Sequence, residues 1–195
     1  GSNPNLLINP DFMIDQRGTN ILTSINSKYF SDRWYVSSDL NSQISLKFDG
    51  SSNRIPGVII QSGNGTFYLS QRIEQTKTDE VRGNNATFSI MDDNGIHYIT
   101  ANIPASGNYM SNNLTYFGDV GIAIVIDNSG RLSTTIYVKA GKTVNIYWAK
   151  FEIGEIATPF SPPEAGTEFI RCCRYLYRIA MKDSGSWGDF VYGLG

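Results

Sequence analysis

Apolar and polar residues alternate along much of the chain, which predicts strands rather than helices. In residues 43–48, the side chains of Ile44, Leu46 and Phe48 fall on one face and polar side chains fall on the other. Residues 67–74 repeat this pattern. Because a period of two places one face of a strand on a core and the other in water, we predict half-buried strands at both places.

Two other stretches depart from simple alternation. Residues 120–126 are continuously apolar, so we predict a strand that is covered on both faces. The strand that begins at Thr143 carries Val144, Ile146 and Trp148, and it leads into a loop with Pro159, Pro162 and Pro163. Proline cannot donate to a ladder, so the sheet should end in this loop.

Turn signals separate about eight to ten short strands, which favours a two-sheet β-sandwich. A short apolar strand is expected at residues 5–12, and it should end in an Asx turn at Asn9-Pro10-Asp11. Residues 102–118 are rich in Asn, Ser and aromatic residues, and we expect a loop there. No amphipathic helix is expected before Pro163.

The chain changes character after Pro163. Thr167 is a fair N-cap, and apolar residues at helical spacing then predict a short amphipathic helix: Phe169, Ile170, Cys173 and Leu176. A strand-like extension follows. We therefore divide the chain into a sandwich at 1–163 and a helix with a C-terminal extension at 164–195. About thirty residues cannot build their own core, so this part should pack on the sandwich or on a neighbouring subunit.

Composition excludes several classes of function. The formal charge is −2, from 16 basic and 18 acidic residues, and no basic cluster is present, which argues against a nucleic-acid partner. No apolar run reaches the roughly 20 residues of a membrane span, so membrane insertion is not expected. Cys172 and Cys173 are adjacent and His97 is the only histidine, so neither a disulfide scaffold nor a closed zinc site is expected.

Several spaced blocks are more specific than the composition. They are Asn5-Leu6-Leu7-Ile8-Asn9-Pro10-Asp11-Phe12, Gln16-Arg17-Gly18, Asp32-Arg33-Trp34, the strand at 68–74 and the run Trp148-Ala149-Lys150-Phe151-Glu152-Ile153-Gly154-Glu155-Ile156-Ala157-Thr158-Pro159-Phe160. Together they resemble the carbohydrate-binding-module-like domain of phage and prophage tail-fibre proteins. The segment at 172–177 departs from this family, which more often reads Cys-Gln-Arg-Tyr-Tyr.

The resemblance implies an all-β fold, a jelly-roll β-sandwich with a short C-terminal helix and strand extension. It implies a non-enzymatic virion part, made in the bacterial cytoplasm, that binds host surface polysaccharide, adjoins other tail-fibre domains and assembles as a homotrimer. A purely structural connector or trimerisation domain is the alternative, and a glycan-active enzyme is a third hypothesis.

Sugar binding calls for exposed aromatic rings with amides beside them, because a pyranose has an apolar face and polar edges. Trp34 and Trp148 are expected in strands and in the core. The candidate glycan-binding residues lie in polar, Gly/Asn-rich segments: Asn108, Tyr109, Asn112, Asn113, Tyr116, Phe117 and Trp187.

Metal and catalysis remain alternatives. No cofactor is expected except a structural Ca²⁺, for which Asn9, Asp11 and Glu152 are the candidate ligands if the N-terminal strand runs beside the strand that follows Thr143. A hydrolase triad would have to use His97, and no nucleophile-elbow sequence accompanies it. Catalytic residues are therefore not assigned.

Overall fold

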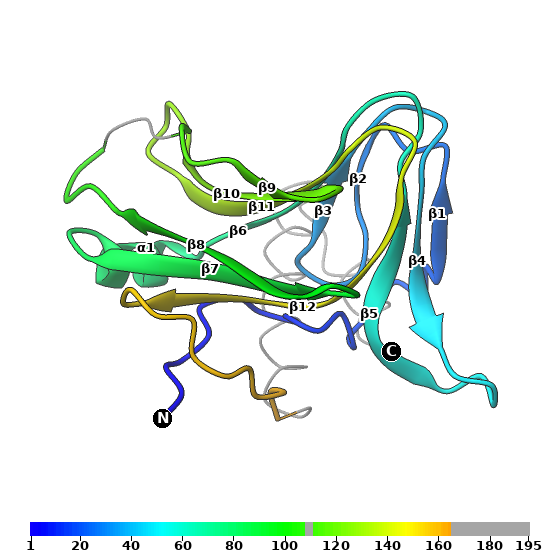
Figure 1. Ribbon diagram of the computed structural model, residues 1–195, viewed down its shortest axis with the longest axis horizontal. Coiled ribbons are helices and arrows are strands. Elements are labelled where there is room, and N and C mark those ends of the chain that lie inside the picture. Colours follow the sequence, from blue (N-terminus) through cyan, green and yellow to red (C-terminus); the bar gives the residue numbers. More distant parts are fainter. Residues whose placement is uncertain (108–110, 165–195) are drawn as a thin grey trace, which may run out of the picture.

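The computed structural model describes residues 1–107 and 111–164. Two six-stranded antiparallel sheets face each other (Figure 1). Sheet A has the order β1-β4-β5-β12-β7-β8, and sheet B has the order β2-β3-β6-β11-β10-β9. The strands of sheet A are β1 (Ile21–Thr23), β4 (Gln43–Phe48), β5 (Arg54–Gln61), β12 (Thr143–Ile153), β7 (Asn85–Asp92) and β8 (Gly95–Asn102). Those of sheet B are β2 (Ser27–Tyr29), β3 (Tyr35–Ser37), β6 (Phe67–Arg72), β11 (Leu132–Val138), β10 (Val120–Ile126) and β9 (Thr115–Phe117).

The chain crosses between the sheets after β1, β3, β5, β6, β8 and β11, as in a jelly-roll sandwich. This confirms the predicted all-β fold class. The predicted C-terminal helix and extension, with Thr167, Cys173 and Trp187, lie outside the described residues. Among the described residues, no helix has the length and apolar character needed to cross a membrane.

The alternating residues build the core between the sheets. Ile44 and Leu46 of β4 and Phe67 and Leu69 of β6 are buried, as their pattern predicts. Phe48 was expected on the same face as Ile44, but its side chain is 41% exposed. A register shift between Leu46 and Lys47 interrupts the pairing of β4 with β5, which explains the exception.

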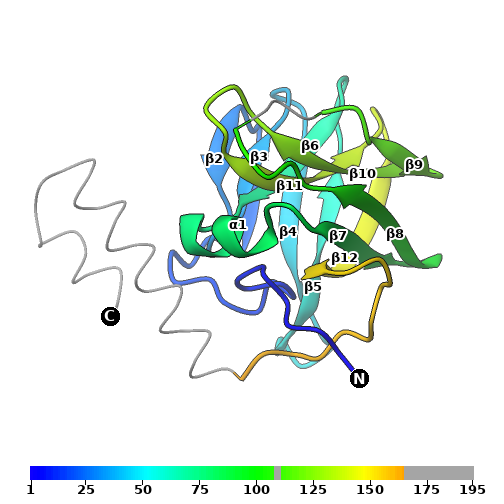
Figure 2. The ribbon, with the colours of Figure 1, turned by 90° about the vertical axis from the view of Figure 1, so that its left-hand side faces the viewer.

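Helix α1 (Gln75–Val81) was not expected. It joins β6 to β7 and lies at one end of the sandwich (Figure 2). Only Thr78 and Val81 of this short helix are buried. Seven residues with so few buried positions cannot show an apolar stripe of helical period, so the sequence pattern gave no signal.

Residues 5–11 run along β12, in the lower layer of Figure 1. The Leu6 N–H donates to the Phe151 carbonyl (2.8 Å), and the Ala149 N–H donates to the Pro10 carbonyl (2.9 Å). This is the proximity on which the calcium hypothesis depends. The segment is not the regular strand that we expected, because Asn9 has a φ of 52° and the ladder cannot continue through it.

The Asn9 side chain forms hydrogen bonds with two other segments of the chain. Its Nδ2 donates to the Ile14 carbonyl, the Ser31 Oγ and the Asp32 carbonyl at 2.8–2.9 Å, and its Oδ1 accepts from the Ile14 N–H. The predicted turn is present, since the Phe12 N–H donates to the Asn9 carbonyl (3.3 Å), while the Asn9 side chain makes contacts that reach farther along the chain. The Trp34 indole N–H donates to the Asn9 carbonyl (2.8 Å), so Trp34 is core as expected, although it precedes β3 rather than lying in a strand.

Gln71 connects this segment to sheet B. It is 1% exposed, its Oε1 accepts from the Ile8 N–H, and its Nε2 donates to the Ile8 carbonyl, both at 2.8 Å. The side-chain amide therefore replaces a strand partner for Ile8.

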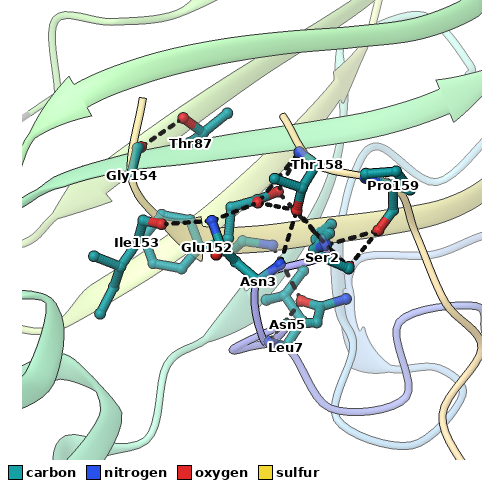
Figure 3. A network of polar contacts seen from close by, with 12 residues as sticks. Ser2, Asn3, Asn5, Leu7, Thr87, Glu152, Ile153, Gly154, Thr158 and Pro159 are labelled. Carbon is teal, nitrogen blue, oxygen red and sulfur yellow. Dashed lines mark hydrogen bonds and ion pairs between the residues drawn. The ribbon is translucent and has the colours of Figure 1, made fainter. Parts of the chain in front are cut away.

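The outer face of β12 carries Trp148, Lys150 and Glu152, and the loop after β12 covers it. The Trp148 and Phe160 rings stack with centroids 4.7 Å apart. Lys150 Nζ donates to Thr158 Oγ1 and to the Pro159 carbonyl, both at 2.8 Å. Glu152 Oε1 accepts from the Thr158 N–H (3.2 Å) and from Asn3 Nδ2 (3.4 Å), as Figure 3 shows.

Lys150 and Glu152 are both buried, and Lys150 Nζ lies 3.9 Å from Glu152 Oε2. Burial lowers the pKa of Lys150, and the Glu152 carboxylate opposes that shift. Each charge is compensated by hydrogen bonds as well as by its partner, which is the condition under which buried ion pairs are tolerated.

We predict that Trp148→Ala lowers the free energy of unfolding by about 3–5 kcal/mol, the range for removing a buried aromatic ring. Trp148 is 8% exposed, whereas Phe160 is only half-buried, so Phe160→Ala should cost less. Urea unfolding measures both, with Trp148→Phe as the control that keeps a stacked ring. A stability unchanged by Trp148→Ala would contradict this packing.

Gln71→Leu should destabilise the domain by about 2–5 kcal/mol, because it leaves the buried N–H and carbonyl of Ile8 without partners. Thermal and urea unfolding are the measurements. Gln61→Leu at the exposed end of β5 is the matched control and should have little effect. Equal stabilities of the two variants would show that the contact between Gln71 and Ile8 does not hold the N-terminal segment.

Candidate functional site

The outer face of sheet B carries a group of tyrosines, here called the tyrosine face. Its members are Tyr29, Tyr35, Tyr68, Tyr116 and Tyr137. The side chains of Tyr35, Tyr68 and Tyr116 are 37%, 40% and 39% exposed. Inward-pointing neighbours such as Leu69 and Ile136 are fully buried, so alternation along each strand turns the tyrosines to the outside.

Strand register brings these rings into rows. Tyr68 of β6 pairs with Tyr137 of β11, Tyr137 pairs with Gly121 of β10, and Gly121 pairs with Tyr116 of β9. A second row joins Tyr29 of β2 to Tyr35 of β3. Residues paired directly across strands have neighbouring side chains on the same face, so the rows form one surface.

The rings pack mainly edge to face. The Tyr68 and Tyr137 centroids are 5.2 Å apart at 71°, and those of Tyr29 and Tyr35 are 5.1 Å apart at 70°. Gly121 makes room for Tyr116, since a Cβ at that position would lie 2.9 Å from two atoms of the ring. Lys139 Nζ lies 4.9 Å from the Tyr116 centroid. These contacts hold the rings in place while leaving part of each exposed.

A hollow of about 340 Å³ lies beside the second row. Its lining includes Tyr29, Tyr35, Ser70 and Ser133 from the sheet. Charged side chains complete the lining: Arg33, Arg72, Asp127 and Arg131. The tyrosine face and this hollow together provide exposed rings, hydroxyls and charges on one side of the molecule.

The charges in the hollow have different surroundings. Arg33 is buried, and its guanidinium donates to Glu74 Oε1 (3.2 Å) and to the Arg72 carbonyl (3.0 Å). Asp127 accepts from the N–H groups of Arg131 and Ser129. These hydrogen bonds, that of Arg131 first, lower the pKa of Asp127, and the charges of Arg72 and Arg131 add to the effect.

The predicted glycan-binding residues are only partly brought together. Tyr116 lies on the tyrosine face, in β9 rather than in the loop that we expected. Phe117 points to the other side, where its ring stacks on His97 with centroids 4.8 Å apart. Asn113 is engaged with the backbone of Ile124, donating to its carbonyl (2.7 Å) and accepting from its N–H (2.6 Å). Asn112 is exposed.

Three candidates, Asn108, Tyr109 and Trp187, lie outside the described residues. Their part in glycan binding stays a prediction. Sequence analysis did not single out Tyr35, Tyr68 or Tyr137, because these lie at the polar positions of alternating strands. The outward positions Tyr68-x-Ser70-x-Arg72 and Ser133-x-Thr135-x-Tyr137 were the available signal.

The candidate metal ligands belong to separate networks. Asn9 is held by Ile14 and by residues 31–32, and Glu152 by Thr158 and Asn3. Among residues 1–107 and 111–164, no group of three or more His, Cys, Asp or Glu side chains has an arrangement suited to a metal ion. His97 Nε2 lies 2.9 Å from Asp92 Oδ1, so the single histidine of the chain makes a contact between β8 and β7.

Asp11, Asp15 and Asp32 are acidic groups close to Asn9 in the fold. Burial raises the pKa of all three, and the Asp32 charge adds to the rise at Asp15. Gln16 donates to both oxygens of Asp32, through its N–H (2.9 Å) and its Nε2 (2.5 Å), which opposes the rise in the pKa of Asp32. Neither carboxylate oxygen of Asp15 has a hydrogen-bond partner among the described residues.

Comparison with known proteins adds little to this geometry. No family model and no curated protein sequence matches the chain. One similar solved structure, titled as a structural analysis of an exo-beta-agarase, is 15% identical, with a TM-score of 0.30 over 91% of this chain. The matched region spans 31% of that protein, so this chain corresponds to about a third of its length. A TM-score this low supports no inference about function.

We predict that Asp15→Asn stabilises the domain more at pH 7 than at pH 3. A raised pKa in the folded state means that the native carboxyl holds its proton more tightly than the unfolded one. Its contribution to stability is therefore present below about pH 3.8 and is lost as pH rises through the folded pKa. Asparagine cannot ionise, so the variant does not lose this stability as the pH rises.

Urea unfolding of Asp15→Asn and the parent protein at pH 3 to 7 measures the effect. Asp119→Asn, on the exposed turn before β10, is the control for replacing aspartate by asparagine. If the difference in stability between Asp15→Asn and the parent is the same throughout this range, the Asp15 side chain is not the source of the pH dependence.

Proposed function

We propose that this domain binds carbohydrate through the tyrosine face and the adjoining hollow, without catalysis. The observation that carries the proposal is the row of Tyr68, Tyr137 and Tyr116, in which strand register places partly exposed rings side by side. Sugar rings stack through their apolar faces on such a surface, and the hydroxyls of Ser70 and Ser133 are available at the hollow for polar contacts.

The biological setting that we propose is a phage or prophage tail fibre or tail spike that attaches to host cell-surface polysaccharide. The resemblance of the spaced blocks, from Asn5 to Phe160, supports this setting. On the same basis we propose a homotrimer that adjoins other tail-fibre domains in the virion. Three weak sites, each with millimolar to high micromolar affinity, would gain about 10²-fold or more through avidity.

The experiment is a glycan array with the purified domain, followed by calorimetric titration of the bound sugars. We expect Tyr68→Ala and Tyr116→Ala each to weaken binding by about tenfold or more, because each removes a stacking surface. Their unfolding free energies should change by less than about 1 kcal/mol, since both rings are substantially exposed.

Tyr98→Ala is the matched control. Tyr98 is 54% exposed, and it belongs to β8 in the other sheet. Sugar binding should survive this change. A folded domain that binds no glycan on the array, or that binds equally well without Tyr68 and Tyr116, would reject the proposal and favour a structural connector.

A further inference from the structure

The hollow beside Tyr35 has cationic groups that the fold itself does not use. Arg72 ends β6, and Arg131 immediately precedes β11, so both stand at the same end of neighbouring strands. Both residues are exposed and line the hollow. Among the described residues, neither guanidinium has a hydrogen bond or an ion pair.

Arg33 differs from these two. Its guanidinium is committed to Glu74 and to the Arg72 backbone, so its charge is compensated inside the protein. Of the described residues that line the hollow, Asp127 is the only carboxylate. Arg72 and Arg131, whose only nearby opposite charge among these lining residues is Asp127, therefore leave an excess of positive charge, on a chain whose formal charge is −2. The hollow is a locally cationic site on an acidic protein.

We propose that this hollow binds the carboxylate of an acidic sugar, of the uronic acid type, an inference that rests on the proposed carbohydrate binding. A guanidinium presents parallel N–H donors that match the two oxygens of a carboxylate, and such charge-assisted bonds are among the strongest available at a surface. Tyr35 lies at the same hollow, so its ring can contact the sugar while Arg72 and Arg131 hold the acid group.

The negative charge of Asp127 repels an anionic ligand, but one carboxylate does not neutralise two guanidinium groups. Its Oδ1 accepts from two backbone N–H groups of its own turn, Ser129 (2.8 Å) and Arg131 (3.0 Å). Its free oxygen can accept from a sugar hydroxyl. The acid group, a hydroxyl and the ring face of the sugar would thus each contact a complementary protein group within one hollow of about 340 Å³.

The test compares matched ligands on the unmodified domain. Oligogalacturonates, their carboxyl-reduced counterparts, sialylated glycans, sulfated oligosaccharides and neutral glucans and mannans are arrayed together. We expect carboxylate-bearing sugars to dominate and carboxyl reduction to weaken binding by about tenfold or more, as loss of a charge-assisted hydrogen bond predicts. Raising the salt concentration should weaken acidic ligands more than neutral ones.

Variants then assign the effect to the hollow. Arg72→Met and Arg131→Met should each lose about tenfold in affinity for the acidic sugar and keep the parent's melting temperature, because both side chains are exposed. Arg131→Lys keeps the charge without the paired donors, so its affinity for the acidic sugar should lie between that of the parent and that of Arg131→Met. Lys142→Met, at the turn beyond the other end of β11, is the control cation and should bind as the parent does.

The outcomes separate this inference from the proposed function. Preference for neutral sugars, or unchanged acidic binding in both methionine variants, overturns the inference while carbohydrate binding stands. Binding restricted to sulfated sugars also overturns it, because the anion would not be a carboxylate. Absence of binding to every sugar rejects the proposed function and the inference with it.

Discussion

The sandwich depends on how the edge of β12 is completed after β5 leaves it. β12 pairs with β5 only from Thr143 to Ile146, and a register shift between Ile146 and Trp148 marks the point at which its pairing with β7 becomes regular. Beyond that point, the backbone on the β5 side of β12 would lack partners, which is costly in a buried strand. Residues 5–11 supply those partners.

Close approach at this edge constrains the sequence. The Gly57 N–H donates to the Asp11 carbonyl (2.9 Å), so β5 is joined to the inserted segment rather than to β12 at this level. Gly57 has a φ of 106°, and a Cβ there would lie 2.6 Å from the Ile146 carbonyl oxygen. Glycine is therefore required where the strands separate. The sequence blocks that begin at Asn5 and at Trp148 meet here, which explains why they support a fold more directly than a ligand.

Local pattern predicted the strands but not their neighbours. Alternation at 43–48 and 67–74 identified β4 and β6, and continuous apolarity identified β10. The candidate site depends on register, which joins residues as far apart in the sequence as Tyr68 and Tyr137. A strand's outward tyrosine resembles any other half-exposed residue until its cross-strand partners are known. Loop aromatics were therefore favoured, and of these Tyr116 lies on the tyrosine face.

The core and the candidate site share one short segment, residues 31–34. Trp34 bonds to Asn9 and packs on Phe12, with ring centroids 4.7 Å apart, on the core side. The next residue back, Arg33, has a φ of 77° and turns its guanidinium the other way, to Glu74 and to the backbone of Arg72. This left-handed backbone is unfavourable for an arginine, and the contacts on both sides hold it in place. A wall of the hollow is thus fixed by the same network that anchors the N-terminal segment. A site whose wall is fixed before the ligand arrives loses less free energy to ordering on binding, so the proposed sugar binding on a shallow sheet surface would need few contacts.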